Sequence, residues 1–126
     1  MFSHIMIGAN DVEESKTFYD AILGALGYEP GVVDDNGRCF YMNKEGVFAI
    51  TKPINGDAAG HGNGSTVGFA AKDSAAADAW HEAGIANGGT TCEDPPGVRE
   101  GAAGKLYLAY LRDPSGNKIC ALHRMG

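Results

Sequence analysis

The chain has 126 residues, a length typical of one domain with a single core. Hydrophobic residues make up 44% and charged residues 21%, which is typical of a globular protein and excludes a disordered chain. The formal net charge is −6, and the ten Lys and Arg residues do not cluster. We therefore expect no nucleic-acid partner, because such partners need a basic face.

Targeting features and cysteines predict a cytoplasmic protein. No apolar run approaches the roughly 18 residues that a membrane span needs, and the first residues lack the positively charged region of a signal peptide. The three cysteines, Cys39, Cys92 and Cys120, are odd in number and far apart, which indicates free thiols in a reducing compartment. We expect no membrane partner.

The first half of the chain predicts a strand, a helix and three further strands. An apolar run over residues 2–9 indicates the first strand. Asp11 begins the helix, with Glu14 completing a capping box, and Gly24 or Gly27 ends it. Turn-forming residues then separate three short strand candidates, at residues 28–33, 38–43 and 47–52.

The second half repeats this order. A strand at residues 66–71 precedes a helix cap at Asp73 or Ser74 and a helix at residues 75–86. In this repeat Asp73 takes the place of Asp11, and Trp80 that of Phe18. Strand candidates and connections follow: a weak strand at 90–93, a loop at 94–104, and strands at 106–112 and 117–124 around a type I turn at 113–116. The repeat predicts one domain over residues 1–126, with module one at about 1–57, a linker at about 53–64 and module two at about 65–126.

Motifs in both modules resemble a known family. The first module has HIMI at residues 4–7 followed by Asp11, and LGALGY at 23–28 as its helix exit. The second has VGFA at 67–70 and the closing hairpin YLRDPSGNKI at 110–119. In order and spacing these motifs are similar to those of the glyoxalase/bleomycin-resistance/dioxygenase superfamily, also called the vicinal oxygen chelate superfamily.

The resemblance implies the fold and the assembly. We expect an α+β protein of two βαβββ modules, each a curved mixed sheet with one helix on its convex face. The resemblance also implies that the paired modules form a cup that holds a small molecule, and that the chain forms a homodimer. In the metal-dependent enzymes of the family, side chains from the first and last strand of each module hold a divalent cation such as zinc, nickel, manganese or iron.

The four metal positions implied by the resemblance are mostly without ligands. His4 is present on the first strand, but its counterpart in module two is Thr66. The closing-strand carboxylate falls at Cys120, and the corresponding place in module one at about Ile50. A stable site usually needs at least three protein ligands. We therefore expect the family's metal site to be mostly lost, with His4 as the one metal ligand if a metal binds.

Strand alternation predicts which side chains face the cup. If His4 points inward, so do Met6 and Gly8, and the same parity applies to the other inner strands. Only one of Tyr107 and Tyr110 can face inward, because they lie on opposite faces of their strand. Tyr107 is favoured, because it comes just after the loop at residues 94–104. Arg99, in that loop, either clamps an anionic group or is a solvated charge. The predicted ligand contacts are His4, Met6, Thr66, Gly68, Arg99, Tyr107, Cys120 and Leu122.

Three functions are consistent with this pattern. The first is binding of a small, largely apolar molecule in the cup. The second is a lyase or isomerase of the lactoylglutathione-lyase-like type, or a dioxygenase-like enzyme, with His4 as base or metal ligand. In that case Cys120 is a second catalytic candidate, the alternative being a small buried apolar side chain. The third is an interaction module whose pocket is vestigial.

Overall fold

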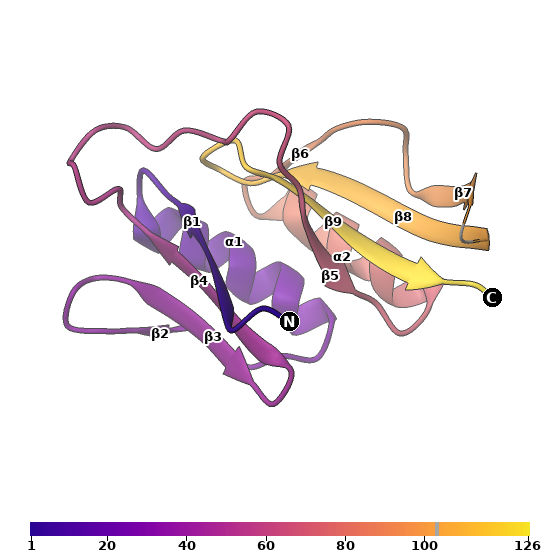
Figure 1. The fold of residues 1–126 in the computed structure, drawn as a ribbon, viewed down its shortest axis with the longest axis horizontal. Coiled ribbons are helices and arrows are strands. Elements are labelled where there is room, and N and C mark those ends of the chain that lie inside the picture. Colours follow the sequence, from indigo (N-terminus) through magenta and orange to yellow (C-terminus); the bar gives the residue numbers. More distant parts are fainter. Residues whose placement is uncertain (103) are drawn as a thin grey trace.

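A computed structural model of the chain describes residues 1–102 and 104–126 and contains two βαβββ modules, side by side (Figure 1). The elements of module one are β1 (His4–Gly8), α1 (Val12–Ala25), β2 (Val32–Val33), β3 (Cys39–Asn43) and β4 (Gly46–Thr51). Those of module two are β5 (Val67–Ala70), α2 (Ser74–Ala86), β6 (Thr90–Thr91), β7 (Gly97–Gly101), β8 (Gly104–Arg112) and β9 (Lys118–Arg124). The predicted fold class and module architecture are confirmed, and module two contains one additional strand, β7.

Each module forms one mixed sheet. The strand orders are β1-β4-β3-β2 and β5-β9-β8-β6, and β7 also pairs with β8. In both modules the first strand runs parallel to the last, while the remaining pairs are antiparallel. The first and last strands of a module are therefore neighbours, as the resemblance implied.

One predicted loop contains a strand. Within residues 94–104, β7 pairs antiparallel with the beginning of β8, from Gly97 opposite Leu108 to Gly101 opposite Gly104. Prolines and glycines favour a loop in this segment, but backbone pairing with β8 outweighs that local preference. Ala103, which belongs to the same predicted loop, lies outside the described residues.

The helices begin where the sequence predicts. The carboxylate of Asp11 accepts the backbone N–H of Glu14 at 3.1 Å, and that of Asp73 accepts the N–H of Ala76 at 2.8 Å. Of the two glycines expected to end the first helix, Gly27 takes the left-handed conformation, with φ of +96°, whereas Gly24 stays inside α1.

Both modules share one hydrophobic core. Phe18 on α1 and Trp80 on α2 are fully buried in a single cluster with residues of both sheets. Across the module boundary, the rings of Phe48 on β4 and Phe69 on β5 make an edge-to-face contact with centroids 5.1 Å apart. No helix in the described part of the chain is long and apolar enough to cross a membrane.

Candidate functional site

The first strand of each module presents its side chains as predicted. On β1, Ile5 and Ile7 pack against the core, so His4 and Met6 lie on the opposite, exposed face. On β5, Val67 and Phe69 pack against the core, so Gly68 and Ala70 lie on the opposite face. We call this surface, which faces away from the helices, the inner face of the two sheets.

The closing strand has the same alternation. Ile119 and Ala121 belong to the core cluster, so Cys120 and Leu122 lie on the inner face of β9. Gly68 pairs with Cys120, and a Cβ atom added to this glycine would lie 3.2 Å from the Cys120 Sγ. The missing side chain at Gly68 therefore leaves room for the thiol.

The prediction that Tyr107 faces the cup is wrong. The Tyr107 hydroxyl donates to the Asp78 Oδ1 on α2 at 2.7 Å, so this side chain lies on the helix side of the sheet. That hydrogen bond and burial raise the pKa of Tyr107. Tyr110 pairs directly with Cys120 and therefore shares the inner face, with the Lys118 ammonium 5.0 Å from its ring centroid.

A cavity of about 340 Å³ opens where the modules meet, and we call it the junction cavity. It takes His4 from β1 and Gly68 and Ala70 from β5. Its wall is rich in aromatic rings and carries polar groups from the turn between β3 and β4. The remaining lining residues are Met1, Phe2, Ser3, Ile5, Leu23, Tyr28, Tyr41, Asn43, Glu45, Gly46, Val47, Phe48, Val67 and Phe69.

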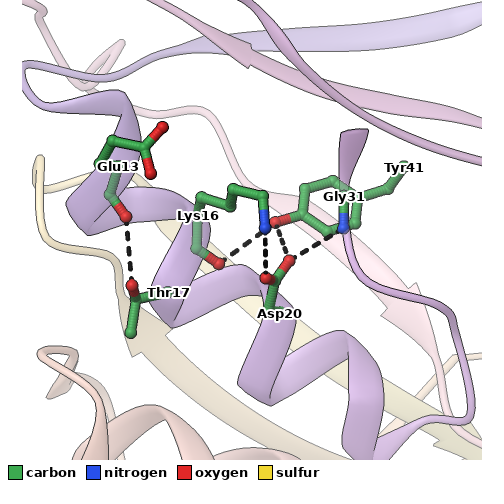
Figure 2. A network of polar contacts seen from close by, with 6 residues as sticks. All are labelled: Glu13, Lys16, Thr17, Asp20, Gly31 and Tyr41. Atoms are coloured by element: carbon green, nitrogen blue, oxygen red, sulfur yellow. Dashed lines mark hydrogen bonds and ion pairs between the residues drawn. The ribbon is translucent and has the colours of Figure 1, made fainter. Parts of the chain in front are cut away.

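A polar network fixes one aromatic wall of the junction cavity (Figure 2). The Tyr41 hydroxyl donates to the Asp20 Oδ1 at 2.8 Å, and the Gly31 N–H donates to the same atom at 2.9 Å. Lys16 donates to the other carboxylate oxygen at 2.7 Å. Burial raises the pKa of Asp20, but these hydrogen bonds outweigh it and hold the pKa below its usual value. The ionised carboxylate therefore keeps the Tyr41 ring in one orientation.

His4 is the exposed imidazole of this cavity. It begins β1, and its Nδ1 lies 2.8 Å from the Ser3 Oγ; the tautomer decides which of the two donates. Near it on the cavity wall, burial and the Glu45 carboxylate raise the pKa of Tyr28. An imidazole, a neutral phenol and a carboxylate thus border an otherwise largely apolar space.

The Cys120 thiol is not in an activating environment. It is 6% exposed, and burial raises its pKa to about 11, although the charge of Lys118 opposes this shift. The cation that lowers the pKa of this thiol is thus Lys118. At neutral pH the thiol is protonated.

We expect Cys120 to resist alkylation at neutral pH. With a pKa of about 11, only about one thiol in 3,000 is ionised at pH 7.5, so iodoacetamide should modify the less buried Cys92 first. Mass spectrometry of peptides from the alkylated protein measures both rates, with Cys120→Ser as the control that assigns the slow site. Rapid alkylation of Cys120 at pH 7.5 would contradict the structure.

The family's metal does not fit the donors present. Among residues 1–102 and 104–126, no group of three or more His, Cys, Asp and Glu side chains is placed to hold a metal ion. The strand register also corrects the fourth position: Met6 pairs with Ala49 as Gly68 pairs with Cys120. Ala49 is thus the counterpart of Cys120, while Ile50 is fully buried in the core.

Of the eight predicted contact residues, His4 and Gly68 line the junction cavity and the other six do not. Two of those six, Thr66 and Arg99, make contacts elsewhere. Thr66 precedes β5 and lines a second, smaller pocket of about 160 Å³ with Arg112 and Lys118. The Arg99 guanidinium donates to the backbone oxygens of Asp94 and Pro95, both at 3.0 Å. It therefore stabilises the segment that precedes β7. A ligand contact for either residue stays a prediction.

Sequence reasoning missed most of the junction cavity. Tyr28 follows α1, Asn43 ends β3, and Glu45 lies in the turn between β3 and β4. All three residues belong to module one, and Val67–Ala70 of β5 complete the cavity wall. No local pattern in the sequence indicates that these residues line one cavity.

The fold and the cavity define an α+β protein of paired βαβββ modules with a ligand-sized space at their junction. The chain belongs to the Glyoxalase/Bleomycin resistance protein/Dioxygenase superfamily, whose family model matches residues 1–121. A comparison with curated proteins gives no match.

Solved structures resemble the whole chain. A glyoxalase/bleomycin resistance protein from Albidiferax ferrireducens T118 is 68% identical over 98% of this chain and 99% of that chain, with a TM-score of 0.95. A glyoxalase-related enzyme from Fulvimarina pelagi is 19% identical over 98% and 88%, with a TM-score of 0.74. A lactoylglutathione lyase from Agrobacterium tumefaciens is 19% identical over 98% and 92%, with a TM-score of 0.67. The last two show a shared fold alone.

Proposed function

We propose that this chain binds a small, largely apolar molecule in the junction cavity. The observation that carries the proposal is the cavity of about 340 Å³ between the modules, whose wall includes the rings of Phe48 and Phe69. This volume lies within the range of about 300–1,000 Å³ that is typical of small-molecule sites. Aromatic walls favour a ligand with a flat ring, because offset or edge-to-face ring contacts add to apolar burial.

The polar groups of the cavity narrow the choice of ligand. His4, Asn43 and Glu45 border the aromatic part of the wall. Such a site orients a ligand by one or two polar groups while its apolar body is buried. A ligand with a hydrogen-bond donor for Glu45 suits this wall better than an anionic one, because an anion would face the carboxylate.

Filling the cavity should abolish binding. Ala70 is exposed on the inner face of β5 and lines the cavity, so Ala70→Trp puts an indole into the ligand's space. The matched control is Ala79→Trp on the exposed face of α2. Thermal-shift screening of aromatic and amine-containing compounds measures binding, since a ligand at a hundred times its Kd stabilises by about 2.7 kcal/mol.

We expect hits with the unmodified chain and with Ala79→Trp, and none with Ala70→Trp. Hits that bind Ala70→Trp as tightly would place the ligand elsewhere. An absence of hits across a broad panel would favour the third function, an interaction module with a vestigial pocket.

A second candidate is a lyase or isomerase that uses His4 as a base. It is favoured by the exposed imidazole on the cavity wall. The donors among the described residues do not fit a metal ion, so this candidate assigns the base to the imidazole alone. His4→Ala should abolish turnover in a lactoylglutathione lyase assay without changing the unfolding free energy, and turnover that survives this change would exclude the imidazole as base.

We also propose that the chain forms a homodimer through the inner face of module one. Met6, Val32 and Met42 share this face and are 37%, 63% and 66% exposed, and contiguous exposed apolar side chains are typical of interfaces. Light scattering should give twice the mass of the chain, and Met42→Glu should give the monomer. A monomeric unmodified chain would contradict the proposal.

Cys39, Cys92 and Cys120 are free thiols, which supports a cytoplasmic location.

A further inference from the structure

The segment between the modules forms a second pocket with one end of the closing hairpin. Residues 52–66 contain turns but no helix or strand, and their last part lies against β8 and β9 (Figure 1). The pocket has a volume of about 160 Å³ and shares no lining residue with the junction cavity. It is lined by His61, Gly62, Asn63, Gly64, Ser65, Thr66, Arg112 and Lys118.

Two cationic side chains lie side by side in this pocket. Arg112 on β8 and Lys118 on β9 are direct partners in the strand register, so their side chains leave the same face of the hairpin. Like charges directly opposite each other destabilise an antiparallel pair. In the described part of the chain, the one carboxylate that forms an ion pair with either of them is Glu93, which pairs with Lys118. The arrangement therefore keeps an excess of positive charge.

Both cations are held in place. The Arg112 Nη1 donates to the Gly116 backbone oxygen at 2.8 Å. The Lys118 ammonium is paired with Glu93 and lies 5.0 Å from the centroid of the Tyr110 ring. Positioned cations bind an anion more tightly than mobile ones, because less side-chain entropy is lost on binding.

The opposite wall is a glycine-rich turn. Gly62 and Gly64 have φ of +52° and +100°, and the Ser65 N–H donates to the Gly62 oxygen at 2.8 Å. Without side chains at the two glycines, backbone amides can approach a bound group closely. The Asn63 amide and the Thr66 hydroxyl are further donors among the lining residues.

We propose that this pocket binds an oxyanion, the phosphate or carboxylate group of a small molecule, between Arg112, Lys118 and the turn at residues 62–66. None of the described lining residues is acidic, although the whole chain carries a net charge of −6. The local charge is thus opposite to that of the molecule. The volume suits one anionic group better than a complete ligand, which usually occupies at least about 300 Å³. The site is independent of the function proposed for the junction cavity.

The first test is a titration of the intact, isotopically labelled chain with inorganic phosphate, followed by amide NMR shifts. We expect the amides of Gly62, Gly64 and Thr66 to shift and to saturate, whereas sodium chloride at equal ionic strength leaves them unchanged. Sulfate and acetate distinguish the source of the anion: saturation by phosphate and sulfate alone indicates a phosphate group, and saturation by acetate alone a carboxylate. Shifts that never saturate with any of the three anions would overturn the proposal.

Three variants separate an anion site from a structural ion pair. Lys118→Met removes one cation and should raise the Kd for phosphate at least about tenfold, the effect of losing one charge-assisted hydrogen bond. Glu93→Gln removes the competing carboxylate and should lower the Kd severalfold, because Lys118 is then free to bind phosphate. Lys105→Met, at an exposed lysine of β8, is the matched control and should change nothing.

Glu93→Gln distinguishes an anion site from a structural ion pair most clearly, because this variant keeps both cations. If Lys118 and Glu93 only stabilise the fold, removing Glu93 leaves phosphate affinity unchanged or lowers it. Either result, or an unchanged Kd in Lys118→Met, would overturn the assignment.

Discussion

Asp113→Ala should lower the free energy of unfolding by about 3 kcal/mol, since several buried donors lose their acceptor at once. The Asp113 side chain belongs to a residue that is 5% exposed. Its Oδ1 accepts the backbone N–H groups of Ser115 and Asn117, both at 2.9 Å. Its Oδ2 accepts the Tyr19 hydroxyl at 2.6 Å and the Asn117 amide at 2.9 Å.

The loss should spread beyond the turn, because these bonds join the two modules. Tyr19 lies on α1 of module one, while Asp113 begins the turn of module two. The Asn117 amide also donates to the Gly8 oxygen at the end of β1, at 2.8 Å. The Asn10 N–H donates to the Ser115 Oγ at 2.9 Å. Asp113→Ala should therefore weaken ligand binding in the junction cavity as well as the fold.

Urea denaturation followed by circular dichroism measures the effect. Tyr19→Phe removes one donor alone and should lower the unfolding free energy by about 1–2 kcal/mol. Asp35→Ala, at an exposed aspartate of a turn, should stay within about 0.5 kcal/mol. An Asp113→Ala variant no less stable than Tyr19→Phe would show that the carboxylate does not hold the turn.

Features set by local chemistry were predictable from the sequence. The caps at Asp11 and Asp73 need only an aspartate before an amphipathic segment, and the inner face of β1 and β5 needs only alternation of two residues. Both are confirmed. The same holds for the turn that begins at Asp113, in which the Gly116 N–H donates to the Asp113 oxygen at 2.9 Å.

The register of β8 against β9 follows from the turn that joins these strands. The N–H of Asp113 pairs with the oxygen of Asn117, which places Tyr110 opposite Cys120. The turn type predicted in the sequence already implies this pairing, so the turn, and not the distance from the loop at 94–104, distinguishes Tyr110 from Tyr107. The position expected at about Ile50 falls at Ala49 for a related reason, because the repeat of the two modules does not fix the parallel register of β1 and β4.

Tertiary contacts explain the remaining differences. The beginning of β8 pairs with a segment whose composition favours a loop. The junction cavity forms where the hairpin of β3 and β4, with Asn43 and Glu45, meets the other module. Its walls come from segments far apart in the chain, so neither periodicity nor spacing indicates it.

The close contact of the two helices should make Gly84→Ala destabilising by about 1–3 kcal/mol, the usual effect of overpacking a core. Gly84 is buried on α2, and an added Cβ would lie 2.3 Å from the Leu111 Cδ1 and 3.3 Å from Ile22 Cγ2 and Phe18 Cε1. Leu111 is itself fully buried, so its side chain has no free space to move into. The clash should outweigh the gain in helix propensity, which is about 1 kcal/mol.

Gly24→Ala is the matched control, because it makes the same change in α1 where a Cβ would meet nothing within 4 Å. It should stabilise the chain by about 0.5–1 kcal/mol, so the two substitutions should have opposite signs in urea denaturation. In the Gly84→Ala background, Leu111→Val should cost less than it does alone, because the smaller side chain relieves the clash. Equal gains from Gly84→Ala and Gly24→Ala would mean that α1, α2 and β8 do not pack as closely as the structure shows.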